Sequence, residues 1–363
     1  MLRLPLAPNQ YPPALRWCEP HANRAFAKPQ VGRRDVTEPS CNCVVLAAGS
    51  FAGKVHSTEN PWCPLRFVSY ALAMALPTPK ENSTALVTGS SSGIGSEIAR
   101  ELARRGHGVT LVARREDRLK ALADELAQMW GVRTEVIAAD LADADSRGEL
   151  PRQVEDRGLT VDILVNNAGF TTMGPVHRAD RAQELAMVRT DVEAVVDLCT
   201  LFVPGMVTRH RGAVLNTAST AAFQPLPGQA GYGAAKAFVL SYGRALGAEL
   251  RETGVTVTTL CPGPVETGFA EAAGLADDEA AETLPKFMWV PAADVAHAAV
   301  EGLATGRPVV IPGAANRATA ALAYLAPKAL ILPMMAQRHP AMKPSPPSPS
   351  QGPPPPSQGS SKS

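Results

Sequence analysis

Short apolar runs alternate with amphipathic stretches along the middle of the chain, from residue 84 to residue 316. Uninterrupted apolar runs predict strands covered on both faces, and a 3.6-residue spacing of apolar positions predicts helices. The predicted strands are 85–88, 109–113, 134–138, 161–165, 213–217, 255–261 and 308–312. The predicted helices are 94–105, 118–130, 142–157, 181–208, 229–252 and 292–304. This alternation predicts an α/β fold, a Rossmann-type doubly wound parallel sheet of about seven strands with helices on both faces.

The two ends of the chain lack this pattern. Residues 1–73 show no sustained helical or strand period, so we predict an extension that is disordered or lies upstream of the true start, Met74. A transit peptide is an alternative, because arginine is frequent there and acids are few. The alternating pattern predicts one domain at 80–316. Beyond it we predict an apolar helical segment at 317–339 and a disordered, proline-rich tail at 340–363.

Composition narrows the set of possible partners. The chain has 363 residues and a net charge of +1, which gives no electrostatic case for nucleic-acid binding. No window reaches the ~18 uninterrupted apolar residues of a membrane-spanning helix, so we expect a cytoplasmic protein. Peripheral contact of the apolar segment 318–336 with a membrane is an alternative. Cys41 and Cys43 are too close for the usual Cys-x-x-Cys zinc pair, and we predict no metal site.

A glycine-rich turn lies between the first predicted strand and the first predicted helix. Gly89 permits a tight turn, Gly93 lets the backbone approach a pyrophosphate, and Gly95 lets the helix pack closely on the strand. The unpaired N–H groups at the start of the helix attract the same anion. We therefore predict a dinucleotide cofactor in contact with Gly89, Ser91, Ser92, Gly93, Ile94 and Gly95.

The end of the second predicted strand indicates which dinucleotide binds. At this point, which faces the adenosine ribose, an acidic residue suits NAD and an arginine suits the 2′-phosphate of NADP. The chain has Arg114 and Arg115 here, so we predict NADP(H) in preference to NAD(H), with Arg114 as the first choice. The alternative is that both are solvated charges at a helix start. Asp140 and Leu141 follow the third strand, where Asp140 is placed to meet the adenine amino group.

The segment Tyr232-Gly-Ala-Ala-Lys236 carries the candidate catalytic pair. A tyrosine hydroxyl has an ordinary pKa near 10, which is too high for efficient proton exchange at neutral pH. A lysine one helical turn away lies on the same face, stabilises the phenolate and lowers the pKa of the tyrosine. Tyr232 could then protonate a carbonyl oxygen in reduction or deprotonate an alcohol in oxidation. The alternative is a tyrosine that only packs in the core.

These motifs together resemble the short-chain dehydrogenase/reductase family. The resemblance rests on five motifs in family order over about residues 80–316: Thr88-Gly-x-x-x-Gly-Ile-Gly95, Asn166-Asn-Ala-Gly169, Ser219, Tyr232-x-x-x-Lys236 and Pro262-Gly263. It implies a nicotinamide-dependent oxidoreductase that acts between C=O and CH–OH groups as a homodimer or homotetramer. It also implies that Ser219 hydrogen-bonds the substrate oxygen, and that the cofactor contacts Asn167, Ala168, Gly169, Tyr232, Lys236, Pro262, Gly263, Val265 and Thr267.

One position departs from the family pattern. Many relatives carry asparagine in the long helix, where the side chain and a nearby kink support a water that relays protons to the lysine. This chain has Asp191 there, as an uncertain member of the catalytic set. A carboxylate accepts hydrogen bonds but lacks the amide's donors, and it counters the positive charge that Lys236 presents to Tyr232. We predict that Asp191→Asn keeps at least comparable activity.

The substrate side of the sequence is apolar. The predicted lid at 264–291 and the segment 221–228 suggest a hydrophobic, elongated carbonyl substrate, although ordinary lid packing explains the same residues. The C-terminal part is more weakly similar to reductases of long-chain keto-acyl substrates, including those of mycolate synthesis. One alternative is a nicotinamide-binding regulator or scaffold without turnover. Another is a sugar-nucleotide epimerase or dehydratase, for which too little chain follows the last strand.

Overall fold

The computed structural model describes residues 76–265, 285–327, 329, 332–333 and 336–337. Within them lies one parallel sheet with strand order β3-β2-β1-β4-β5-β6-β7. Since β1 is flanked by β2 and β4, the strand order reverses there, which is where ligands bind in such sheets. The strands are β1 (Ser83–Thr88), β2 (Val109–Ala113), β3 (Thr134–Ala138), β4 (Thr160–Asn166), β5 (Gly212–Thr217), β6 (Val255–Leu260) and β7 (Val309–Val310).

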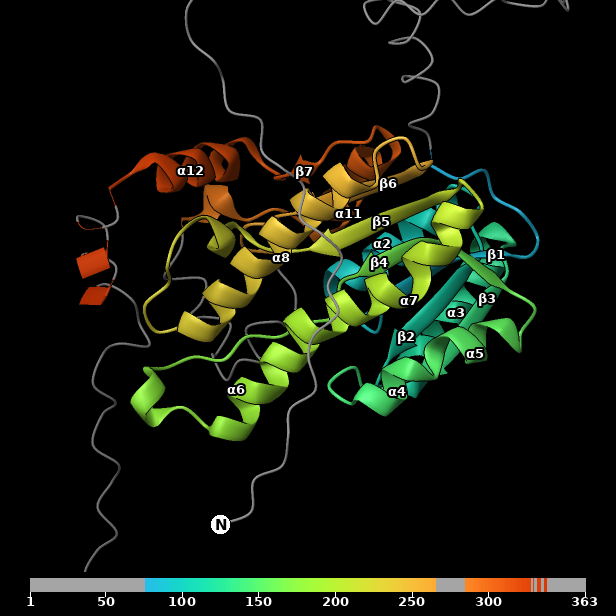
Figure 1. Ribbon diagram of the computed structural model, residues 1–363, viewed down its shortest axis with the longest axis horizontal. Coiled ribbons are helices and arrows are strands. Elements are labelled where there is room, and N and C mark those ends of the chain that lie inside the picture. Colours follow the sequence, from blue (N-terminus) through green and yellow to red (C-terminus); the bar gives the residue numbers. More distant parts are fainter. Residues whose placement is uncertain (1–75, 266–284, 328, 330–331, 334–335, 338–363) are drawn as a thin grey trace, which may run out of the picture. The chain divides into compact units, whose positions relative to one another are not determined.

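Helices cover both faces of this sheet (Figure 1). Strand side chains alternate between the two faces, so Ala85 and Val87 pack with one layer and Leu86 with the other. The first layer is α2 (Gly93–Arg104), α3 (Glu116–Trp130) and α11 (Ala292–Ala304). The second layer includes α5 (Leu150–Glu155), α7 (Ala194–Thr208) and α8 (Ala230–Glu249). The predicted Rossmann-type α/β fold is confirmed.

Two predicted helices are interrupted. The stretch predicted at 142–157 forms two short helices, α4 (Ala144–Gly148) and α5, and the second begins with Leu150 and Pro151. Proline suits a first turn because its missing N–H has no helical partner there, but it cannot continue a preceding helix. The stretch predicted at 181–208 contains α6 (Arg181–Val188), the π-helical turn η2 (Arg189–Glu193) and α7. Apolar spacing alone does not reveal such a turn.

Short elements complete the described chain. They are η1 (Val176–Arg178), η3 (Thr220–Phe223), η4 (Lys286–Met288) and α12 (Ala314–Leu325). Helix α12 begins inside the predicted domain and seats Ala320 and Ala323 against the core. No helix in the described ranges is long and apolar enough to cross a membrane.

Candidate active site

The turn from β1 into α2 has the backbone shape that its glycines predict. Gly89 and Gly93 have φ of 66° and 60°, in the left-handed region that favours glycine. A Cβ on Gly89 would lie 2.7 Å from the Cα of Ala168, so the backbones touch directly. Ser92 precedes α2 without a side-chain capping bond, and the buried Oγ of Ser90 has no hydrogen-bond partner. This cradle of free N–H groups fits a phosphate group.

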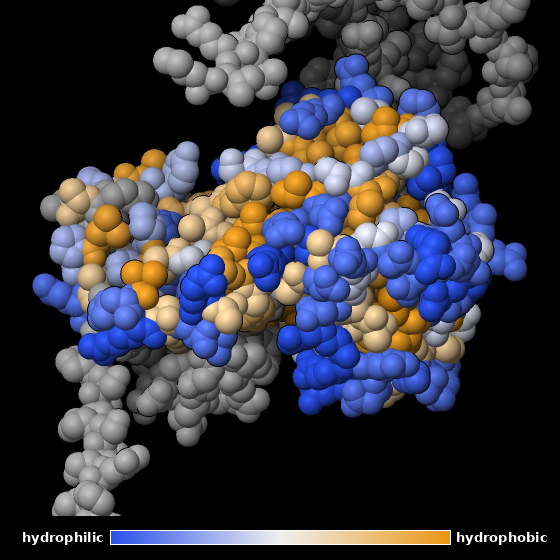
Figure 2. All heavy atoms as spheres, turned by 60° about the horizontal axis from the view of Figure 1, so that its bottom comes forward, coloured by the Kyte–Doolittle hydropathy of each residue, from blue (hydrophilic) through white to orange (hydrophobic). Residues whose placement is uncertain are grey.

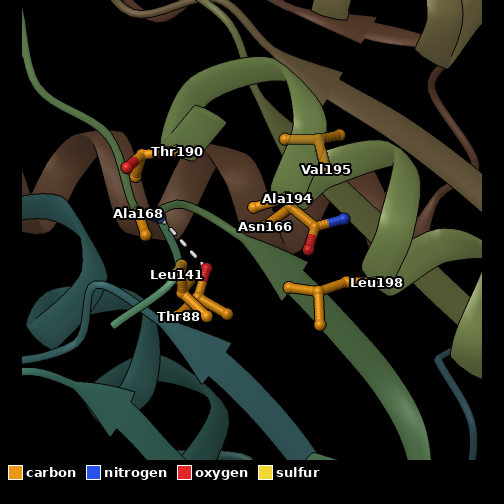
Figure 3. Close-up of a pocket in the computed structure, with 8 residues that line it drawn as sticks. All are labelled: Thr88, Leu141, Asn166, Ala168, Thr190, Ala194, Val195 and Leu198. Carbon is orange, nitrogen blue, oxygen red and sulfur yellow. Dashed lines mark hydrogen bonds between the residues drawn. The ribbon is translucent and has the colours of Figure 1, made fainter. Parts of the chain in front are cut away.

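Thr88 fastens the glycine turn to the segment that follows β4. Its hydroxyl donates to Val165 O at 3.1 Å and accepts from the N–H groups of Asn167 and Ala168 at 2.9 and 3.0 Å. The Asn167 side chain donates to Thr88 O at 3.1 Å. Figure 3 shows Thr88 and Ala168 joined in this way beside a small hollow. The hollow is lined by Thr88, Leu141, Asn166, Ala168, Thr190, Ala194, Val195 and Leu198.

The two arginines after β2 differ in position. The Arg115 guanidinium reaches the glycine turn and donates to Ser91 Oγ at 2.9 Å and to Ser92 Oγ at 2.8 Å. Arg114 is exposed. Arg115, the second choice from sequence, is therefore the arginine that contacts the predicted cofactor turn.

Arg147 was not singled out by the sequence, yet it connects Leu141, on the predicted adenine side of the site, to η2. Its side chain is buried and donates to Leu141 O at 2.7 Å. The same guanidinium pairs with Glu193 at 2.6 Å and with Asp197 at 2.7 Å. Asp140 is exposed beside Leu141 and accepts from Ala142 N–H at 3.0 Å. No local spacing signalled this link, because it joins residues about fifty positions apart.

Tyr232, Lys236 and Ser219 come together at the carboxyl ends of β5 and β6. Tyr232 and Lys236 lie on α8 and are 9% and 5% exposed, and Lys236 Nζ is 5.6 Å from the centre of the Tyr232 ring. Ser219 hydrogen-bonds the Tyr232 side chain and accepts from Ala221 N–H at 3.1 Å. Lys236 Nζ donates to Thr217 O at 3.2 Å. A hydroxyl pair with a cation beside it can bind a carbonyl oxygen and give it a proton.

Burial and charge set the protonation of the pair. Burial raises the pKa of Tyr232, Lys236 and the bond from Ser219 lower it, and Asp191 raises it again. The lysine therefore acts in the expected direction, but the net shift of the tyrosine pKa is upward. Burial opposes the charged form of Lys236, yet the charges of Asp191 and Tyr232 outweigh it and raise the pKa of this lysine.

Asp191 lies in η2 and contacts the lysine directly. Its Oδ2 is 2.8 Å from Lys236 Nζ, and the two side chains are 0% and 6% exposed. The contact is a buried ion pair. Oδ1 accepts from Phe170 N–H at 3.0 Å. A Cβ on Gly169 would lie 2.9 Å from this carboxylate, so the glycine allows the close approach.

The loop after β6 completes the site. Pro262 is buried, and Gly263 packs against the buried side chain of Asn316 in α12. Asn316 donates to Met288 O and Pro312 O at 3.0 and 3.1 Å, so it ties this loop region to η4. Val265 packs against the main core, whereas Thr267 lies outside the described residues. Sequence reasoning missed Asn316, which no motif marks.

The chain matches known proteins over this fold. The short chain dehydrogenase family matches residues 83–278. A short chain dehydrogenase of Pseudocercospora fijiensis is 37% identical over 191 residues, 52% of this chain and 61% of that protein. A very-long-chain 3-oxoacyl-CoA reductase of Anas platyrhynchos is 34% identical over 232 residues, 62% of this chain and 74% of that protein.

A solved structure agrees with the sequence matches. A short-chain dehydrogenase from Sphingobium yanoikuyae in complex with NADPH superposes with a TM-score of 0.59 at 32% identity. The match covers 70% of this chain and 95% of the other. The motifs, the sheet and the Tyr232–Lys236–Ser219 cluster agree with these matches: the chain belongs to the short-chain dehydrogenase family and is a nicotinamide-dependent oxidoreductase acting between CH–OH and C=O groups.

Proposed function

We propose that this protein reduces a hydrophobic keto compound, such as a keto-acyl lipid, with NADPH. The observation that carries the proposal is the Tyr232–Lys236–Ser219 cluster next to an apolar wall. Met187, Tyr232 and Ala235 form a buried apolar group, with Phe170, Ala221 and Leu226 packed around it. An apolar wall with few polar groups favours a hydrophobic substrate and orients its carbonyl through Tyr232 and Ser219.

The chain's own residues supply the proton chemistry. Ser219 and Tyr232 bind the carbonyl oxygen, and Tyr232 donates its proton to that oxygen as it becomes an alcohol. Lys236, held by Thr217 O, stabilises the phenolate left on Tyr232. The glycine turn and the Thr88–Asn167–Ala168 contacts hold the dinucleotide, whose nicotinamide supplies the hydride when bound. In oxidation the same groups work in reverse.

An assay of NADPH oxidation tests the reaction and the substrate class together. Wild type is given simple ketones and 3-oxoacyl esters of increasing chain length, and we expect kcat/KM to rise with apolar length. Tyr232→Phe is the matched control, with turnover reduced by ~10²–10⁴ and NADPH binding kept. NADPH binding by wild type without oxidation of any substrate would favour a non-catalytic nicotinamide-binding regulator or scaffold instead.

We also propose a preference for NADP(H) over NAD(H), supported by Arg115 against Ser91 and Ser92. An arginine beside two hydroxyls offers several donors to a 2′-phosphate. Arg115→Ala should lower kcat/KM for NADPH relative to NADH by at least about tenfold, since a charged hydrogen bond contributes about 1.5–3 kcal/mol. Arg114→Ala is the comparison, and a larger loss there would restore Arg114 as the main contact.

Surface apolar groups support two association proposals. Leu322, Tyr324 and Leu325 of α12 are 69%, 65% and 79% exposed, which supports peripheral membrane contact through 318–336. Co-sedimentation with vesicles, compared with a Leu322→Ser/Leu325→Ser variant, measures it. Figure 2 shows apolar residues across the middle of the face that it draws. Leu201 of α7 and Phe238 of α8 are 37% and 43% exposed, which supports a homodimer or homotetramer that light scattering measures.

A further inference from the structure

The ion pair between Asp191 and Lys236 is the most deeply buried charge contact near the catalytic hydroxyls. Its two atoms are 2.8 Å apart, with the side chains 0% and 6% exposed. Charges so far from water interact strongly, because no solvent screens them. Lys236 therefore presents to Tyr232 a charge that is largely compensated from the other side.

Among the residues that the structure describes, few other ionisable groups face this cluster from the elements packed around it. The Cys261 thiol follows β6 and acts electrostatically on Lys236, and Arg244 of α8 acts on Cys261. Glu184 of α6 approaches Gly231, the residue before Tyr232. Ser219 bonds the Tyr232 hydroxyl. Asp191 is the carboxylate that touches the lysine itself.

We propose that Asp191 is a positioning residue that compensates the Lys236 charge and thereby keeps Tyr232 protonated to higher pH than a neutral residue would. The proposal rests on the proposed proton-donor role of Tyr232. A protonated Tyr232 is the form needed for carbonyl reduction, and the phenolate is the form needed for alcohol oxidation. Asp191 thus extends reduction towards higher pH and moves the onset of oxidation to more alkaline pH.

The position of the Asp191 carboxylate also supports its role in compensating the Lys236 charge. Phe170 N–H fixes Oδ1, which leaves Oδ2 directed at Lys236 Nζ. The lysine is held from a second direction by Thr217 O. Burial raises the pKa of Asp191, whereas Lys236 and the Phe170 N–H lower it in part. The carboxylate and the ammonium therefore depend on each other for their charged states.

A titration of the Tyr232 phenolate by near-ultraviolet absorbance tests the proposal. It uses the full chain without substrate or cofactor, so it can fail or succeed independently of the proposed reaction. Subtracting the same titration of Tyr232→Phe isolates the Tyr232 signal in each background. We expect Asp191→Asn, which keeps an acceptor for Phe170 N–H, to lower the midpoint by on the order of one pH unit.

Asp162→Asn is the matched control, because Asp162 is also buried and paired, with Arg211 at 2.7 Å, near the other end of β4. It should leave the midpoint unchanged. An unchanged or higher midpoint in Asp191→Asn would overturn the proposal, and a lower melting temperature alone would mark Asp191 as structural. Asp191→Ser gives the same comparison if the asparagine variant does not fold. With a substrate in hand, the oxidation profile of Asp191→Asn should move to lower pH by the same interval.

Discussion

At the scale of single residues, the site depends on close contacts between small and polar side chains. A Cβ on Gly263 would lie 2.5 Å from the side chain of Asn316, which two hydrogen bonds hold in place. The sequence marked Gly263 through the Pro262-Gly263 motif but gave no reason for a glycine there. The reason is Asn316, more than fifty residues later, and only the fold brings the two together.

This contact predicts a specific rescue. Gly263→Ala should lower the free energy of unfolding by about 1–3 kcal/mol, because a buried, bonded asparagine cannot move aside. Asn316→Ala should also destabilise, since it leaves the Met288 and Pro312 carbonyls without these bonds. The double variant should be more stable than the sum of the two losses predicts, as measured by denaturant unfolding. Strict additivity of the two losses would show that Gly263 and Asn316 do not constrain each other.

At the scale of elements, η2 is the feature that the sequence concealed. Its apolar spacing continues the helices on either side, so the pattern at 181–208 predicts one uninterrupted helix. The π-helical turn places Asp191 towards Lys236, while Glu193 in the same turn pairs with Arg147. The guanidinium of Arg147 in α4 therefore joins the loop at Leu141 to η2.

Removing that guanidinium should destabilise the fold. Arg147→Met should lower the free energy of unfolding by about 2–3 kcal/mol, because Leu141 O loses its donor and Asp197 is left without its cation. This loss is at the low end for buried pairs, since Glu193 is 53% exposed and can regain water. Arg152→Met is the control. Arg152 makes only exposed pairs with Glu149 and Asp156, and we expect no measurable change. Equal effects in the two variants would contradict the role given to Arg147.

At the scale of the whole molecule, the candidate active site lies at the carboxyl ends of the strands. A buried histidine at the opposite ends of the strands makes the stability of the fold depend on pH. His107 lies between α2 and β2 and is 6% exposed. Burial, with the charges of Arg105 and Arg211, lowers the pKa of His107 to about 4, and Asp162 opposes this only in part. The folded protein therefore holds this histidine neutral at pH values where the unfolded chain protonates it.

The sign of the pH effect follows from proton binding. The pKa of His107 is 6.5 in the unfolded chain and about 4 in the folded protein. The unfolded state therefore binds more protons between these two pH values. The free energy of unfolding should keep its full value above pH 6.5 and should fall by roughly 2–3 kcal/mol as the pH is lowered to 4.5. Denaturant unfolding at several pH values measures this dependence. In His107→Gln the free energy of unfolding should change less between pH 6.5 and pH 4.5. A wild-type stability that is constant over this range would refute the assignment.

The sequence by itself predicted the sheet and the reaction class, and it marked Tyr232, Lys236 and Ser219, which the fold brings together. These features are local patterns: apolar strand runs, glycines at fixed spacing and Tyr232-x-x-x-Lys236. A local pattern can be recognised in the sequence before the fold is known. Helix ends and the break before Pro151 were less well predicted, because capping and packing decide them.

Only the tertiary structure decided which long-range partners act on that trio. It placed Asp191 against Lys236, Arg115 against the glycine turn, and Asn316 against Gly263. It also reversed the net shift expected for the Tyr232 pKa, because burial and a second charge outweigh the lysine. Such effects depend on distance and exclusion of water, which are properties of the folded chain and not of residue order.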